Sequence, residues 1–238
     1  MLIANTPGWP KVRRAFFNGH EFSASFPEIL RAFALNVRLF VIAEIAVLIL
    51  GLLVAVIRSL SGPALFPFRA MAVVYTDVFR GVPTLLLIFL FGFGVPALGL
   101  NRPWNKAIIW ATVAIILNYG AYVAEVFRAG IRSIHPSQMA AARSLGLTQW
   151  QAFRYVIIPQ AARRVIPPLL NDFVALQKDT ALVAAVGPLD ALRRAQIASA
   201  RHFNFTPYVA AAVLFLALTI PLARFTDWLT ARQEAARR

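Results

Sequence analysis

The stretch from Leu39 to Ile57 reads LFVIAEIAVLILGLLVAVI, nineteen residues in which Glu44 is the only charged side chain. One α-helix needs about 20 apolar residues to cross the hydrocarbon core of a bilayer. The whole chain has the same character, because 59% of its 238 residues are hydrophobic, 14% are charged and the mean hydropathy is +0.66. A soluble domain carries about 25% charged residues. The composition therefore predicts an all-α membrane protein and excludes an ordinary soluble domain.

Four further stretches are candidates for membrane spans. Two are plainly apolar, residues 107–124 and 208–223, and a third, residues 71–96, is apolar but contains Asp77, Arg80, Gly81 and Pro83. The fourth, residues 165–189, contains polar side chains but keeps its apolar residues at helical spacing. Such a helix can cross a membrane when its polar face looks into a helix bundle or a wet cavity. The sequence therefore predicts five transmembrane helices.

The chain divides into three parts by composition. We assign residues 1–34 to an N-terminal extension, residues 35–230 to a transmembrane domain and residues 231–238 to a C-terminal tail. In residues 22–40, apolar side chains recur at helical spacing with charged ones between them. This pattern fits an amphipathic helix at the membrane interface, and it fits a plain extension of the first span equally well.

The net charge of +14 comes from 24 Lys and Arg residues against 10 Asp and Glu residues. Most of the arginines lie between or at the ends of apolar runs, where cationic side chains meet lipid headgroups, and no nucleic-acid recognition motif accompanies them. Cationic residues near the spans are more numerous on the side that holds residues 128–164 and the C-terminus. We therefore expect the N-terminus outside and the C-terminus in the cytoplasm, with lipid and not nucleic acid as the partner.

The long polar segment over residues 128–160 is predicted to hold two short helices. His135-Pro136-Ser137 can start the first helix with proline at an early position, and Gly146 is a natural stop. Thr148-Gln149-Trp150-Gln151 has the spacing of a capping box, which opens the second helix. Pro159 is expected to break or kink that helix before the next span.

The same segment resembles the cytoplasmic EAA loop of ATP-binding-cassette (ABC) importer permeases. That motif reads Glu-Ala-Ala, three residues, Gly, nine residues and Ile-x-Leu-Pro, and here it is matched by Ala140-Ala141-Ala142, Gly146 and Val156-x-Ile158-Pro159. Three flanking segments look like permeases of the polar amino acid uptake class: Phe79-Arg80-Gly81-Val82-Pro83, Asn118 to Ile131, and Leu176 to Leu182. The resemblance covers about residues 35–228.

The resemblance implies a type I importer permease of the bacterial inner membrane. Such a subunit pairs with a second permease, either a copy of itself or a relative, and with two cytoplasmic ATPase subunits that dock on the 134–150 loop. An extracytoplasmic solute-binding protein delivers the amino acid, and ATP drives alternating access. No G-x-x-x-x-G-K-[ST] segment occurs in the sequence. We therefore expect no enzyme activity and no cofactor in this chain, with ATP and Mg²⁺ held by the partner ATPase.

One position departs from the family motif, because Ala140 stands where the motif has glutamate. The charged contact that glutamate commonly supplies is absent, so Arg143 or Gln138 is expected to supply another. The residues expected to couple this chain to the ATPase are Ser137, Gln138, Ala140, Ala141, Ala142, Arg143, Gly146 and Pro159.

Ionisable and polar groups within the apolar stretches are candidates for the substrate path, because such groups are costly in a membrane. Arg80 could hold a substrate carboxylate, or Asp77, three residues earlier, could simply neutralise it. Asn118 could contact a zwitterion, or it could bond a neighbouring helix. Asp179, with Thr180 beside it, could receive an α-ammonium group. We therefore name Arg80, Asn118, Asp179 and Thr180 as path candidates.

Other polar groups have plainer explanations. Glu125 and Arg128 form an i, i+3 pair of the structural kind, and Glu44 has no partner that the sequence reveals. The three histidines are scattered, so no metal site is predicted. Two alternative functions remain at this point: an ATP-independent secondary transporter, which would usually show two related halves that are not visible here, and an ABC permease for another small solute.

Overall fold

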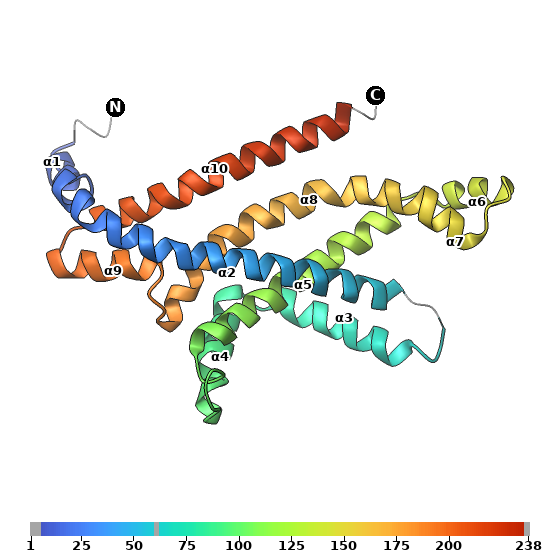
Figure 1. Cartoon of the computed structure of the whole chain (residues 1–238), viewed down its shortest axis with the longest axis horizontal. Coiled ribbons are helices and arrows are strands. Elements are labelled where there is room, and N and C mark those ends of the chain that lie inside the picture. The colour runs from blue at the N-terminus through green and yellow to red at the C-terminus, as the bar shows by residue number, and fades with distance from the viewer. Residues whose placement is uncertain (1–5, 60–61, 236–238) are drawn as a thin grey trace. The chain divides into compact units, whose positions relative to one another are not determined.

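The computed structural model describes residues 6–59 and 62–235, and within these ranges it contains helices and no strands. The long helices are α2 (Gly19–Ser59), α5 (Ala107–Arg132), α8 (Ile158–Asp179) and α10 (Thr206–Ala235) (Figure 1). The shorter elements are α1 (Trp9–Phe16), α3 (Phe66–Gly81), α4 (Thr84–Gly94), η2 (Pro96–Leu98), α6 (Pro136–Ser144), α7 (Gln149–Ala152), η3 (Phe153–Ile157), η4 (Thr180–Val186) and α9 (Ala191–His202).

Three of these helices are long and apolar enough to cross a membrane. They are the helical stretch Trp9–Ser59, which includes α2, helix α5, and the part of α10 from Thr206 to Arg232. The pair α3 and α4, interrupted at Val82 and Pro83, counts as a fourth span if the two helices cross together. Helix α8 does not reach this apolarity among the described residues, so the predicted number of five spans is not confirmed by length and composition.

The structure decides one assignment that the sequence left open and changes the bounds of one predicted span. Helix α2 runs without interruption through residues 22–40, where the sequence left open an interfacial helix or an extension of the first span. The predicted span over residues 165–189 starts earlier, at Ile158, and changes at Thr180 from an α-helix to the tighter 3₁₀ helix η4. Of the predicted C-terminal tail, residues 236–238 lie outside the described residues.

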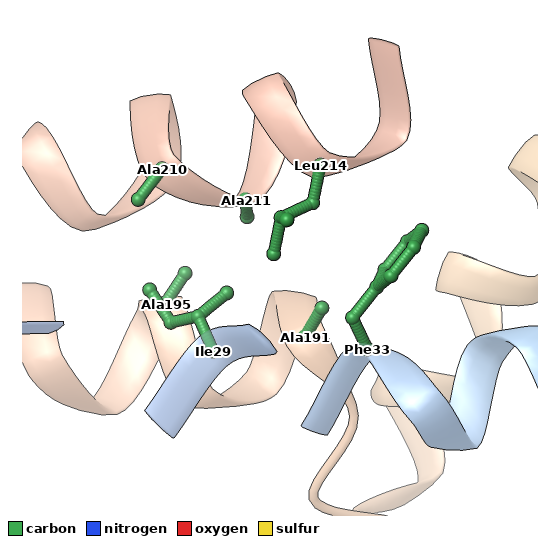
Figure 2. Close-up of a cluster of buried hydrophobic side chains, with 7 residues drawn as sticks. All are labelled: Ile29, Phe33, Ala191, Ala195, Ala210, Ala211 and Leu214. Atoms are coloured by element: carbon green, nitrogen blue, oxygen red, sulfur yellow. The ribbon is translucent and has the colours of Figure 1, made fainter. Parts of the chain in front are cut away.

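The residues fold into two compact units. Of the described residues, those within 1–42, 85–114 and 177–221 form the first unit, and those within 43–84, 115–176 and 222–238 form the second. In the first unit, seven buried apolar side chains form one cluster (Figure 2). Its small members are alanines of α9 and α10, and its larger members are side chains of α2 and α10. The cluster contains Ile29 and Phe33 of α2, Ala191 and Ala195 of α9, and Ala210, Ala211 and Leu214 of α10.

In the second unit, glycines let the long helices approach each other closely. A Cβ atom on Gly51 of α2 would lie 2.5 Å from Cγ1 of Val123 in α5. A Cβ atom on Gly130 of α5 would overlap Cγ1 of Val165 in α8. Real Cβ atoms do not approach carbon atoms so closely, so these two contacts require glycine. Small residues at helix contacts are typical of membrane bundles, where close packing drives association.

We expect Gly130→Ala to lower the thermal unfolding temperature of the purified chain in detergent. The added methyl group would push α8 away from α5, and such overpacking typically costs about 1–3 kcal/mol. Gly94→Ala is the matched control, because a Cβ atom there meets no atom within 4 Å. Equal unfolding temperatures for the two variants would contradict this packing.

Candidate functional site

Helices α6 and α7 lie in the loop between α5 and α8 (Figure 1). Caps formed by residues close in the sequence define the ends of these helices. The His135 side chain accepts a hydrogen bond from the Ser137 N–H at the start of α6. At the end of α6, Gly146 adopts a φ of +88°, and the N–H groups of Gly146 and Leu147 donate to the carbonyls of Arg143 and Ala142. This is a Schellman motif, which needs a left-handed residue at the position of Gly146.

The second helix of the loop opens with the predicted capping box. The Thr148 hydroxyl accepts from the Gln151 N–H at 3.2 Å, and the Gln151 side chain accepts from the Thr148 N–H at 2.8 Å. Helix α7 is only four residues long and passes into a π-helical turn, η3. Pro159 follows at the start of α8 and has no N–H to donate. The expected break at Pro159 is therefore a change of helix type just before it.

Apolar packing seats this loop on the ends of the long helices. Ile134, Ile157 and Ala161 form a buried cluster, with Met139 of α6 and Phe153 of η3 packed against it. The loop therefore belongs to the packed structure of the second unit, and both apolar contacts and helix caps hold it in place.

The outer face of the loop exposes small and apolar side chains. Ala140 and Ala141 are exposed, whereas Ala142 is buried. Leu145 is 82% exposed and Trp150 is 65% exposed. A space of about 380 Å³ beside Trp150 is lined by Met139, Gln149, Trp150 and Phe153. Exposed apolar groups outside the spans are typical of a surface that a partner covers.

The two polar residues expected to replace the motif glutamate already have partners within the chain. The Gln160 amide donates to the Gln138 side chain at 3.2 Å, and the Arg143 guanidinium donates to the Leu147 carbonyl at 2.8 Å. Ser137 is exposed beside His135, with 2.7 Å between its hydroxyl and the ring nitrogen Nδ1. These contacts stabilise the shape of the loop.

Asn118 bonds both sides of the interruption between α3 and α4. Its side-chain amide donates to the Phe79 carbonyl at 2.6 Å, and its oxygen accepts from the Thr84 hydroxyl at 3.0 Å. The Asn118 side chain is buried. Because Pro83 has no N–H to donate and the helix is interrupted, the carbonyl in the last turn of α3 needs an outside donor. Of the two interpretations of Asn118, the structure contains the bond to a neighbouring helix.

Arg80 lies in the last turn of α3, with its guanidinium over an aromatic ring. Its guanidinium carbon is 5.4 Å from the ring centre of Tyr122, whose hydroxyl donates to the Arg80 carbonyl at 3.3 Å. A guanidinium nitrogen is 3.8 Å from a Glu125 oxygen, and the Arg80 side chain is 40% exposed. Among the described ion pairs of Arg80 the partner is Glu125, and Asp77 does not appear.

Glu125 is the shared partner of three arginines. It binds Arg128 through two hydrogen bonds, of 2.7 and 3.0 Å, and it pairs with Arg58 of α2. Arg58 also donates to the Thr76 hydroxyl of α3 at 2.7 Å. The sequence revealed the Glu125–Arg128 pair because the two residues are one helical turn apart. The sequence did not reveal the pair between Glu125 and Arg58, because these residues lie 67 positions apart.

Asp179 and Thr180 belong to the first unit, whereas Arg80 and Asn118 belong to the second. Thr180 is buried, and its hydroxyl donates to the Gln177 carbonyl at 2.8 Å. The Asn36 amide bonds both Thr180 and Asp190, at 3.4 and 3.0 Å. Asp179 is half-buried at the junction of α8 and η4. Thr180 is thus part of a polar network that the sequence did not indicate, since Asn36 lies 144 residues away.

Glu44 lies half-buried on α2, and it also has a neighbour that the sequence did not reveal. Its carboxylate is close enough to that of Asp172 in α8 for the two to interact electrostatically.

We expect Asn118→Ala to destabilise the chain by about 1–2 kcal/mol, because the Phe79 carbonyl and the Thr84 hydroxyl lose their partner in a buried setting. Asn171→Ala, at an exposed position of α8, is the matched control. Thermal unfolding in detergent measures both variants. If Asn118→Ala unfolds at the same temperature as the control, the amide does not hold the two helices.

Comparison with known proteins matches these features to a transporter family. A family model described as the inner membrane component of binding-protein-dependent transport systems matches residues 48–235. A probable glutamine ABC transporter permease of Bacillus subtilis (strain 168) is 38% identical over 195 residues, which cover 82% of this chain and 88% of that protein. The arginine transport system permease of the same organism is 33% identical over 210 residues, covering 85% and 92% of the two chains.

Solved structures give the same result for the fold. An amino acid ABC transporter solved with histidines superposes with a TM-score of 0.81 at 31% identity, covering 90% of this chain and 98% of that one. An inward-facing methionine ABC transporter shares the fold at 17% identity, with a TM-score of 0.68. The chain therefore belongs to the inner membrane components of binding-protein-dependent transport systems, as a multi-pass permease subunit with the type I ABC importer fold whose ATP is hydrolysed by a separate subunit.

Proposed function

We propose that this permease imports a polar or charged amino acid that a solute-binding protein delivers from outside. In this proposal it works with a second permease, which is a copy or a relative, and with two ATPase subunits that hold ATP and Mg²⁺. Closure of the ATPases on ATP drives alternating access of the permease pair. Family membership sets aside an ATP-independent secondary transporter, and the similarity to glutamine and arginine permeases supports an amino acid as the solute.

The observation that carries the proposal is the capped loop of α6 and α7. Its caps and its apolar seat fix the loop to α5 and α8, so a push on the loop reaches those helices. The exposed alanines at 140 and 141 let another protein approach the α6 backbone closely. Trp150 and Leu145 offer apolar surface to the same partner. We infer that an ATPase groove receives α6, and that Ser137, Gln138 and Arg143 line its edges.

In this proposal the loop faces the cytoplasm. The cationic residues that flank the spans on the loop side support that orientation, because such residues are retained on the inner face of the membrane. The C-terminus then also lies in the cytoplasm, and the N-terminus lies outside. The delivered amino acid would enter from the side opposite to the loop.

We propose that Arg80 contacts the substrate along the path. Its guanidinium is part-exposed, its carboxylate contact is as long as 3.8 Å, and an aromatic ring lies beneath it. A guanidinium can grip a carboxylate through two parallel hydrogen bonds. Asp179, Thr180 and Asn118 stay path candidates, with Asn118 acting through the shape of the interrupted helix.

We expect Ala141→Trp to uncouple the permease from its ATPase. The indole would stand where the proposal has α6 meeting the groove, while the exposed position leaves the fold unstrained. The measurement is co-purification of the ATPase with the permease, together with solute-stimulated ATP hydrolysis in proteoliposomes. Both are expected to fall at least tenfold, which corresponds to about 1.4 kcal/mol of lost contact.

Ala231→Trp is the matched control, because it places the same side chain at an exposed alanine in α10. We expect the control to retain ATPase binding and stimulation. Normal binding and stimulation in Ala141→Trp would contradict docking on α6.

A further inference from the structure

A small basic pocket lies between the last turns of α2 and α5, and it is separate from the exposed face of the loop. Its volume is about 230 Å³. The lining combines three arginines with one hydroxyl and two apolar side chains: Arg58, Arg128, Arg132, Ser59, Ala55 and Ile131.

The positive charge at this pocket is only partly balanced. Glu125 binds Arg58 and Arg128, which border the pocket, and it also lies 3.8 Å from Arg80. Arg132 is exposed, and no carboxylate in the described part of the chain lies within 4 Å of it. One carboxylate thus serves three arginines, while a fourth faces the same space. The arrangement leaves a net positive charge that an anion would balance.

The anion is identified by the donors and by their place at the ends of the helices. Arginine side chains bind phosphate oxygens through paired N–H groups. Arg58 and Arg132 stand in the last turns of α2 and α5, where the apolar sequence ends and lipid headgroups begin. Basic pockets between membrane helices are known to receive acidic headgroups. We propose that this pocket binds a phosphate group, supplied by the headgroup of an anionic phospholipid or by free phosphate.

A bound phosphate would join the last turns of α2 and α5. Arg58 belongs to α2 and also bonds Thr76 of α3, whereas Arg128 and Arg132 belong to α5. The α6 helix begins four residues after Arg132. The ligand would therefore stabilise the helix ends from which the loop departs, and this role holds whichever solute is carried.

The test uses the full-length chain purified in a neutral detergent and freed of lipid. Binding is measured by native mass spectrometry and by the rise in unfolding temperature, with three probes: phosphatidylglycerol, phosphatidylcholine of the same acyl chains, and inorganic phosphate. We expect phosphatidylglycerol to bind more tightly than phosphatidylcholine. Arg132→Gln is expected to weaken phosphatidylglycerol about fivefold, since one basic residue near a headgroup contributes about that factor.

Ser59→Glu is the second variant, because it places a negative charge in the pocket, and we expect a larger loss than in Arg132→Gln. Two controls match these changes elsewhere. Arg201→Gln removes an exposed arginine of α9, and Ser23→Glu replaces a serine whose hydroxyl, like that of Ser59, donates to a carbonyl three residues earlier. The controls are expected to bind phosphatidylglycerol like the unchanged chain.

Two outcomes support the pocket and distinguish the source of its ligand. Loss of phosphatidylglycerol binding in both pocket variants supports a lipid site. A soluble phosphate site is supported if both pocket variants lose binding of inorganic phosphate and the unchanged chain shows no preference for phosphatidylglycerol over phosphatidylcholine. The proposal is overturned if Arg132→Gln and Ser59→Glu bind phosphatidylglycerol and inorganic phosphate like their controls.

Discussion

The second unit depends on one constraint, that a backbone carbonyl freed inside a membrane must find a donor within the protein. The α3–α4 pair frees such groups, because its helical ladder stops at Val82 and Pro83 cannot donate. Asn118 supplies the donor to the Phe79 carbonyl and accepts from Thr84 with the same side chain. The interruption is thereby tolerated, and it leaves Arg80 part-exposed at the end of α3. A candidate substrate contact is thus positioned by a bond whose first role is structural.

A second constraint is the balance of charge at the end of the spans next to the loop. Burying one carboxylate among arginines is favourable only when several cations and hydrogen bonds satisfy it. Glu125 meets this condition through Arg58 and Arg128, and Arg58 extends the network to Thr76 of α3. Three helices are tied together close to the point where the loop begins. The loop itself is held by caps and by the apolar cluster around Ile134 and Ile157. A displacement of α6 would therefore be passed to the connected ends of α2, α3 and α5.

The features that could be predicted from the sequence are those set by local chemistry. Thr148 and Gln151 form their capping box from neighbouring backbone groups, and Gly146 ends α6 because a left-handed residue is needed there. Both signals lie within a few residues of what they determine. The apolar run from Leu39 to Ile57 likewise predicted a membrane helix. The spacing of the loop motif predicted the family, and the comparisons confirm that prediction.

What the sequence could not predict depends on contacts between distant residues. Arg58 joins Glu125 across 67 residues, and Asn36 joins Asp190 across 154. No spacing rule reveals such pairs. The change to a 3₁₀ helix at Thr180 was also missed, because apolar residues at helical spacing continue through it. Arg80 and Asn118 belong to one unit, whereas Asp179 and Thr180 belong to the other. A substrate path that includes all four residues is therefore a proposal about function and does not follow from a shared geometry.

Whether this permease imports an amino acid is best tested by ATP hydrolysis of the complete transporter, reconstituted with its ATPase and solute-binding protein. The rate is measured across a panel of acidic, basic, amide and apolar amino acids, with the unchanged permease and with Arg80→Ala. We predict stimulation by one chemical group of polar or charged amino acids, and a rise in the concentration needed for half-stimulation in Arg80→Ala. A complex that assembles and hydrolyses ATP but responds to no amino acid would contradict the account and assign the permease to another class of solute.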